Sequence, residues 1–200
     1  MGQKKSFHHG DLKRALLNAT LKFIDTETVS GVTIRGVAKA TGVSHAAPIK
    51  HYSDRRQLLT AAANVVFGEI VELTRQRLSA SEQPVRERLI TTAYVLYEYA
   101  LEHPNRYEFI WRNDLVDHDN PDLLITMNRL YYGYNTQADE STLETGFDHD
   151  TLAVMIWSMV HGYADLRLKG MFEERQDQKT GQDRLPAMID LMRNAFFKSS

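Results

Sequence analysis

The sequence contains no cysteine, which excludes a disulfide-stapled scaffold and any metal site built from thiolates. It also lacks a long apolar run, because the longest, LAVMIWSMV from Leu152, is about half the length that a membrane-spanning helix requires. No apolar segment of secretory length precedes the first charged helix. We therefore expect a soluble, cytoplasmic protein with no membrane partner.

Signs of catalytic chemistry are also missing from the sequence. It has no nucleophile elbow, no phosphate-binding glycine loop and no zinc-protease motif. The carboxylates and His118 of the segment DHDNPD, residues 117–122, lack the ordered spacing of metal ligands on a helix and are typical of a polar turn. We predict that the protein is not an enzyme and has no metal site and no cofactor.

The small net charge of −2 hides a strong asymmetry along the chain. Residues 1–60 hold ten Lys and Arg against four acidic residues, a balance of +6, and four histidines in addition. Residues 61–200 hold 14 basic and 22 acidic residues, a balance of −8. This distribution favours an N-terminal part that faces a polyanion and a body that faces something else.

Apolar residues recur at spacings of three and four along most of the chain, with no alternating strand pattern of useful length and no internal repeat. The fold is therefore predicted to be all-α, with the stretch SASEQP around Pro84 as the best linker candidate. Asp11 and Ser53 are the candidate N-caps of the first and fourth helices. Later helices are expected over residues 85–101, within HPNRYEFIW, from Pro121, over 150–168 and over 185–197.

Residues 33–52 have the pattern of a helix-turn-helix. Thr33 can cap the helix IRGVAKAT, Gly42 permits the positive φ of the turn, and Ser44 can cap a short third helix. Pro48 falls in the first turn of that helix, where the missing N–H costs little. We predict a short, stiff recognition helix that presents polar and small side chains to a DNA major groove.

The segment VTIRGVAKATGVSHAAPIKHYSDRRQLLTAAA resembles the DNA-binding domain of the tetracycline-repressor (TetR) family of bacterial transcriptional regulators. The preceding HHGDLKRALLNATLKFI resembles that family's first helix, so the resemblance covers about residues 8 to 70. The chain has Ile49 where the family normally has a tyrosine that bonds a phosphate, Tyr52 where it usually has a phenylalanine, and Arg55 where a lysine is common.

The expected DNA contacts follow from side-chain chemistry together with the resemblance. Thr33 and Arg55 stand near helix N-termini, which favour phosphate oxygens, and His51 is a further phosphate donor. Residues 44–46 are candidates for base edges and thymine methyls, and Tyr52 is expected in the core. The candidate DNA-binding residues are Thr33, Arg35, Ser44, His45, Ala46, Lys50, His51 and Arg55.

In the C-terminal half, IWSMVHGYADL resembles the Trp-x-x-x-His-Gly (WHG) signature of one TetR-family C-terminal domain type. Trp157 and His161 share a helix face, and Gly162 permits the close approach of another helix. His161 is either a ligand contact or a buried, satisfied histidine, and the aromatic residues nearby fit a hydrophobic core as well as a pocket. The candidate ligand-pocket residues are Tyr94, Phe109, Trp111, Met155, Trp157 and His161.

Apolar stripes on the helices 150–168 and 185–197 can form a four-helix homodimer interface, unless they fill the core of a single chain. We predict two domains. Residues 1–54 hold a basic arm with Lys4 and Lys5 and a three-helix helix-turn-helix domain, and residues 55–200 form a larger helical ligand-binding and dimerisation domain. The helix over 53–78 connects them.

The resemblance implies a sequence-specific transcriptional regulator of double-stranded DNA. We expect a homodimeric repressor that responds to a small-molecule effector and binds a palindromic operator with half-sites about one turn apart, ~34–36 Å. The alternative from a different class is an all-α small-molecule-binding protein that reads no operator. The sequence leaves the effector and the choice between repressor and activator open.

Overall fold

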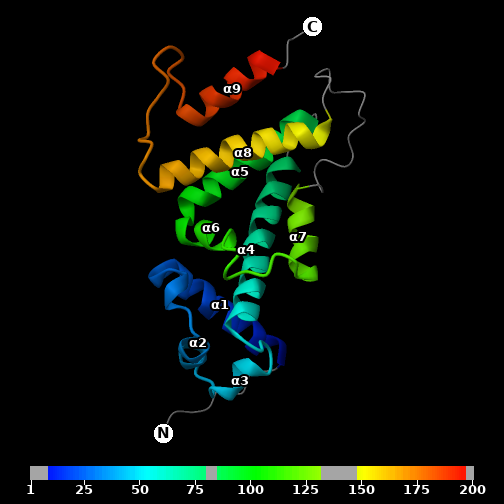
Figure 1. The fold of residues 1–200 in the computed structure, drawn as a ribbon, viewed down its shortest axis with the longest axis vertical. Helices are drawn as coiled ribbons and strands as arrows, with labels where there is room; N and C mark the ends of the chain where they lie inside the picture. Colours follow the sequence, from blue (N-terminus) through cyan, green and yellow to red (C-terminus); the bar gives the residue numbers. More distant parts are fainter. Residues whose placement is uncertain (1–8, 80–84, 132–147, 197–200) are drawn as a thin grey trace. The chain divides into compact units, whose positions relative to one another are not determined.

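A computed structural model describes residues 9–79, 85–131 and 148–196, and within these ranges the chain forms helices and no β-strand (Figure 1). The all-α prediction is confirmed. The predicted basic arm with Lys4 and Lys5 and the predicted linker at Pro84 lie outside the described residues. None of the described helices is long and apolar enough to cross a membrane.

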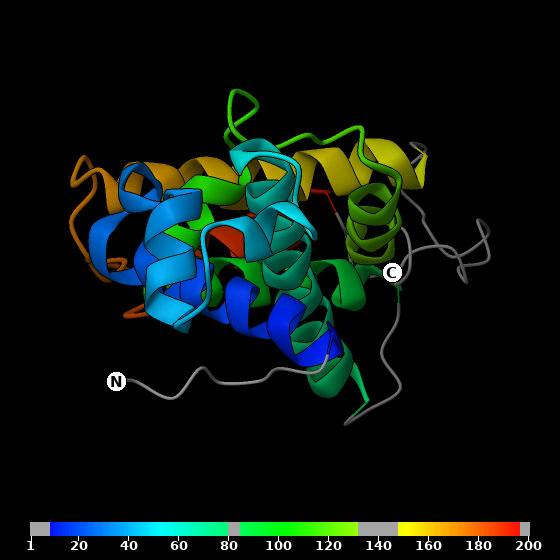
Figure 2. The same cartoon turned by 90° about the horizontal axis from the view of Figure 1, so that it is seen from below.

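The helices group into two compact units, of which unit 1 comprises residues 1–69 and 103–128. Its interior is built from residues at helical spacing, such as Leu16, Ile24, Leu58 and Phe67, which are almost completely buried. Helix α1 packs against α2 and against α6, and α2 packs against α3 (Figure 2). The elements of unit 1 are α1 (His9–Glu27), the 3₁₀ turn η1 (Val29–Gly31), α2 (Ile34–Thr41), α3 (Ala46–Ile49), the first part of α4 (Arg55–Leu78), α6 (Pro104–Ile110) and most of α7 (Pro121–Tyr131).

Unit 2 comprises residues 70–102 and 129–200 and holds the end of α4, α5 (Val85–Glu102), α8 (His149–Leu168) and α9 (Arg184–Phe196). Helices α5 and α8 pack along each other (Figure 1). The start of α8 is capped by the Asp148 side chain, which accepts from the Thr151 N–H at 2.7 Å. The core of this unit is formed by Leu89, Ile90, Ala93, Leu152, Ala153, Ile156, Val160, Tyr163, Leu185, Ile189 and Met192.

The apolar stripe predicted on the last helix lies in the core of its own chain. Leu185, Ile189 and Met192 of α9 pack with α5 and α8. On α8 and α9, the large apolar side chains that stay exposed are Val154, which is 49% exposed, and Leu191, which is 70% exposed. The stripe alone therefore does not define a dimer interface, and the homodimer stays a prediction.

The predicted domain boundary at residue 54 also stays a prediction. Unit 1 extends beyond it, because α6 packs on α1 and the first part of α4 belongs to the same compact unit. The connecting helix, expected over 53–78, is observed as α4 from Arg55 to Leu78.

Three of the predicted helix caps are wrong. Helix α1 begins at His9, so Asp11 lies within its first turn, where its carboxylate pairs with Arg14 at 3.3 Å. Helix α3 begins at Ala46 with no side-chain cap, and Ser44 contributes only its carbonyl oxygen, which accepts from the Ala47 N–H. A single 3₁₀-like bond of this kind can start so short a helix without a side-chain acceptor.

The start of α4 is capped by Asp54 rather than by Ser53. The Asp54 carboxylate accepts from the Gln57 N–H at 2.8 Å, and the Gln57 side-chain oxygen accepts from the Ser53 N–H at 2.6 Å. This reciprocal arrangement satisfies two otherwise free backbone donors at the helix start. It also lowers the pKa of Asp54, chiefly through the hydrogen bond from Gln57.

Candidate nucleic-acid interface

Helix α2 and the turn after it have the geometry that the sequence predicts. The Thr33 side chain caps α2 by accepting from the Gly36 N–H at 2.9 Å. Gly42 ends the helix with φ 71°, a left-handed conformation, and its N–H bonds to the Lys39 carbonyl oxygen at 3.1 Å. Glycine suits this position because a Cβ in the left-handed region is strained. The chain thereby reverses into α3.

Helix α3 contains Pro48 without losing a backbone hydrogen bond. The helix runs only from Ala46 to Ile49, so Pro48 is its third residue, where an N–H would have no acceptor within the helix. The Pro48 side chain is buried, and its carbonyl oxygen accepts from the N–H groups of His51 and Tyr52 at 2.9 and 2.8 Å. Pro48 thus packs this short helix against the rest of unit 1, while the outer face of the helix is exposed.

The outer face of this helix-turn-helix carries most of the residues predicted to contact DNA. Tyr52 is 2% exposed, which confirms its place in the core, and burial raises the pKa of its hydroxyl to about 12. Ile49 is 59% exposed beside Lys50, so α3 presents an apolar side chain next to a cation. His51 is half-buried, whereas Thr33, Arg35, Ser44, His45, Ala46 and Lys50 are exposed.

Arg55 makes two bonds within unit 1 that the sequence did not indicate. Its Nε donates to the Val32 carbonyl oxygen and its Nη2 to the Val29 carbonyl oxygen, both at 2.7 Å. The side chain therefore ties the turn before α2 to the start of α4. A phosphate contact by Arg55 stays a prediction.

The six predicted pocket residues divide between the two units. Phe109 is buried in unit 1, and Trp111 packs edge to face on Phe67 and Tyr107 with ring centroids 5.5 and 5.9 Å apart. The other four lie in unit 2, where Tyr94, Met155 and Trp157 pack against its core. Whether any of the six touches a ligand stays a prediction.

His161 and Trp157 occupy one side of α8, as the spacing of the WHG signature indicates. His161 is half-buried, and desolvation lowers its pKa below the ordinary value. The Trp157 ring lies against Tyr131 with centroids 6.1 Å apart, and its Nε1 is buried without an acceptor among the described residues. The Tyr131 hydroxyl donates to Asp150 at 3.1 Å.

The segment 117–122 forms a turn that is held by hydrogen bonds within the segment and to its neighbours. The His118 Nε2 donates to the Ile110 carbonyl oxygen at 2.8 Å. The Asn120 side chain accepts from the N–H groups of Asp122 and Leu123 and so caps α7. Within the described part of the chain no group of His, Asp and Glu side chains is arranged to hold a metal ion.

Sequence reasoning missed two features. One is the set of ion pairs that Arg106 makes with Asp25 and Glu69, residues far apart in the chain. The other is a cavity beside α8 that none of the six predicted pocket residues lines. Neither feature could be inferred from the periodicity of the sequence, because the residues that form it come together only through tertiary packing.

Comparison with known proteins gives one family and several similar folds. A protein-family model, described as the tetracyclin repressor-like C-terminal domain, matches residues 89–192. A protein with unknown function from Rhodococcus sp. RHA1 is 24% identical, with a TM-score of 0.78 over 97% of this chain and 100% of that chain. No curated protein matches the chain.

Two further solved structures are similar in fold at lower identity. A putative TetR-family transcriptional regulator from Vibrio parahaemolyticus is 18% identical, with a TM-score of 0.64 over 94% of this chain and 100% of that chain. A putative TetR-family transcriptional regulator from Rhodococcus sp. is 20% identical, with a TM-score of 0.61 over 90% of this chain and 97% of that chain.

Proposed function

This chain belongs to the tetracycline-repressor-like family, and we propose that it is a DNA-binding transcriptional regulator that reads its operator through α3. The observation that carries the proposal is the α2–Gly42–α3 unit, in which Thr33 caps the first helix and Gly42 turns the chain into the second. The surplus of basic residues in positions 1–60 supports a polyanionic partner.

The proposed roles follow from exposure and chemistry. Thr33, Arg35 and His51 bind phosphates. Such contacts fix the position of the protein along the duplex but carry no sequence information. Residues 44–46 reach base edges, and Lys50 reaches either a base edge or a phosphate. Ile49 stands where the family's tyrosine would bind a phosphate, and with 59% of its surface exposed it packs on a thymine methyl instead.

Arg55 acts on DNA binding chiefly by positioning. Its bonds to the Val29 and Val32 carbonyl oxygens hold the turn that precedes Thr33. Through that turn, Arg55 sets where the N-terminus of α2 meets the backbone of the duplex. A direct contact between Arg55 and a phosphate is a second possible role, and both predict weaker binding to all sequences when Arg55 is replaced.

The regulator is further proposed to be a cytoplasmic homodimer and a repressor. The support for a dimer is that Val154 on α8 and Leu191 on α9 are apolar side chains left exposed outside the core of unit 2. Pairing two chains there would give two copies of α3 and match a palindromic operator. In sedimentation experiments Leu191→Glu should shift the dimer towards monomer, and a wild-type protein that is monomeric at high concentration would contradict this part.

The test of DNA reading is selection of duplexes from a random pool at ~0.15 M salt, where non-specific phosphate binding is weak. Recovery of a palindrome supports the proposal, and absence of any enriched sequence contradicts it. His45→Ala should alter the selected sequence. Lys50→Ala should flatten the dependence of log affinity on log salt by about one unit if Lys50 binds a phosphate, whereas the matched variant Lys179→Ala in unit 2 should not.

A further inference from the structure

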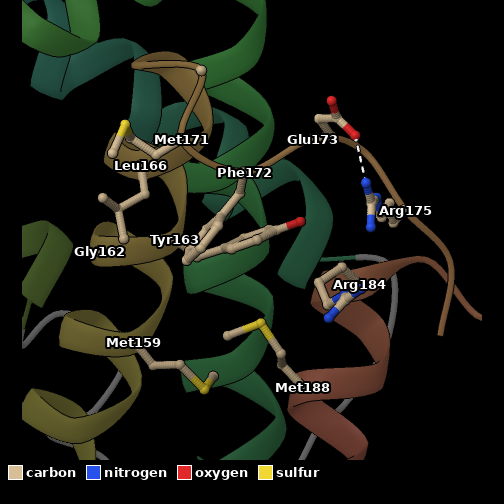
Figure 3. A pocket seen from close by; sticks show the side chains of 11 residues that line it. Met159, Gly162, Tyr163, Leu166, Met171, Phe172, Glu173, Arg175, Arg184 and Met188 are labelled. Carbon is tan, nitrogen blue, oxygen red and sulfur yellow. Dashed lines mark hydrogen bonds and ion pairs between the residues drawn. The ribbon is translucent and has the colours of Figure 1, made fainter.

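Unit 2 contains a cavity of about 910 Å³ between the second half of α8, the segment from Gly170 to Arg175 and the start of α9 (Figure 3). This volume is within the range of small-molecule sites, roughly 300–1,000 Å³. The apolar part of its lining consists of Met159, Tyr163, Leu166, Met171, Phe172 and Met188.

An aromatic stack forms one wall of the cavity. The Tyr163 ring lies between Tyr97 and Phe172, with centroids 5.5 and 6.1 Å away and interplanar angles of 20° and 29°. Figure 3 shows the rings of Tyr163 and Phe172 lying against each other, with Met188 and Met159 reaching the same space. Methionine side chains adapt to varied shapes and contact aromatic groups favourably.

Gly162 leaves room over α8 that nothing in the described chain fills. A Cβ built on Gly162 would meet no atom within 4 Å. Glycine inside a helix costs about 1 kcal/mol relative to alanine, and neither the backbone of α8 nor packing against any described residue requires it here. The missing side chain therefore enlarges the cavity that Gly162 lines.

The mouth of the cavity carries positive charge. Arg175 is paired with Glu173 at 2.8 Å. Arg184, an exposed residue at the start of α9, lines the cavity (Figure 3) and makes no hydrogen bond or ion pair with any residue that the structure describes, although at longer range it helps to lower the pKa of Asp177. A cation in this state beside apolar walls favours a ligand that pairs an apolar body with an anionic group.

Exposed apolar side chains at the rim of the cavity also favour an apolar ligand. Met171 is 71% exposed and Phe172 is 47% exposed, both in a segment without helical structure. A ligand that enters beneath this segment would remove part of their apolar surface from water, which is favourable at about 25 cal/mol per Å².

We propose that this cavity binds an apolar organic molecule with one anionic group, whose body lies over Gly162 between Met159 and Met188 and whose anion pairs with Arg184. Binding itself needs no DNA. That the molecule acts as the effector of the regulator rests on the function proposed above, since a bound ligand would then have to change the affinity for DNA.

The test uses calorimetry on the full-length protein with 2-naphthoic acid and dodecanoic acid as probes, and with 2-naphthylmethanol and dodecan-1-ol as neutral analogues. Wild type should bind at least one acid more tightly than its alcohol. Arg184→Gln should remove most of that preference. Gly162→Leu should weaken binding at least tenfold without lowering the thermal midpoint, because a Cβ there meets no neighbouring atom and leucine favours a helix more than glycine does.

Gly68→Leu is the matched control, because Gly68 is also helical and a Cβ there also meets no atom within 4 Å. It should leave probe binding unchanged. Equal binding by wild type and Gly162→Leu would overturn the proposal, as would the absence of binding by any probe. Loss of the dimer in Gly162→Leu, with no probe bound by wild type, would assign the space over Gly162 to a second chain.

Operator binding by wild type without any probe separates this inference from the proposed function. A protein that selects a palindrome but binds no acid retains the proposed function and refutes the ligand class. A protein that binds the acids but enriches no DNA sequence confirms the site and refutes the regulator.

Discussion

Replacing Arg106 by alanine should destabilise unit 1 more than replacing Arg112, an arginine of the same unit whose ion pair is exposed. Arg106 lies on α6 and is 16% exposed. Its Nε and Nη2 donate to the two carboxylate oxygens of Asp25, each at 2.7 Å. Its Nη1 donates to both carboxylate oxygens of Glu69, at 3.1 and 2.9 Å. One guanidinium thus joins α6 to α1 and to α4.

The expected loss is intermediate between those of buried and exposed ion pairs. Hydrogen bonds to charged groups contribute about 1.5–3 kcal/mol, and exposed ion pairs about 0–1 kcal/mol. The Asp25 and Glu69 carboxylates are 37% and 36% exposed, so water can hydrate them when Arg106 is gone. We therefore expect Arg106→Ala to lower the free energy of unfolding by about 2 kcal/mol, equivalent to about 4–8 °C in Tm.

Urea and thermal unfolding, followed by circular dichroism, would measure the effect. Arg112→Ala is the matched control in the same unit. Arg112 also makes a two-bond pair, with Asp114 at 2.8 and 2.7 Å, but both side chains are well exposed. The variant Arg112→Ala removes the same charge as Arg106→Ala and should leave the unfolding midpoint unchanged. Arg106→Lys should fall between, because an ammonium cannot pair in two-bond fashion with two carboxylates at once.

Equal unfolding midpoints for Arg106→Ala and Arg112→Ala would refute this reasoning. So would a double-mutant cycle between Arg106 and Asp25 with no coupling energy, because the two bonds would then add nothing beyond the separate residues.

Four further outcomes are expected. Gly42→Ala should cost about 1–2 kcal/mol of stability because of the left-handed backbone, whereas Gly68→Ala, with open space around its Cβ, should gain about 0.5–1 kcal/mol; urea titration measures both. Tyr52→Phe should unfold at the same or a higher temperature, since it removes a buried hydroxyl without a described partner. The stability advantage of wild type over Asp54→Asn should be present above pH 3.8 and disappear as pH falls through the lowered pKa of Asp54.

Much of the fold follows from local signals in the sequence. The helices from Val85, from Pro121 and around residues 150–168 lie within a residue or two of their predicted bounds, because amphipathic spacing and proline at a helix start are local properties. The turn at Gly42 was predictable for the same reason. The caps at Ser44 and Ser53 were not, because a neighbouring residue could start either helix equally well.

The candidate site was predictable only in part. The exposure of residues 44–46 and Lys50 follows from the helix-turn-helix pattern. The bonds of Arg55 to Val29 and Val32 do not, since they join residues 23 and 26 positions apart. The cavity over Gly162 depends on the segment from Gly170 to Arg175, which has no periodicity from which its path could be inferred.

Arg106 also lies close to one of the points where the chain passes between the two units. The chain passes between units 1 and 2 within α4, within α7, and between α5 and α6. The third passage is at His103, whose backbone has φ −128° and ψ 60° and is therefore not helical. His103 is the N-cap of α6, and Arg106 lies within one turn of it.

An effector bound in unit 2 can change DNA affinity only if it binds one conformation of the protein more tightly than another. The ion pairs of Arg106 hold α6 to α1 and α4, so a change transmitted through α6 would act on them. If that route carries the coupling, Arg106→Ala should reduce the factor by which a bound acid alters operator affinity, beyond any change in operator affinity without acid. An unchanged factor would place the coupling in α4 or α7 instead.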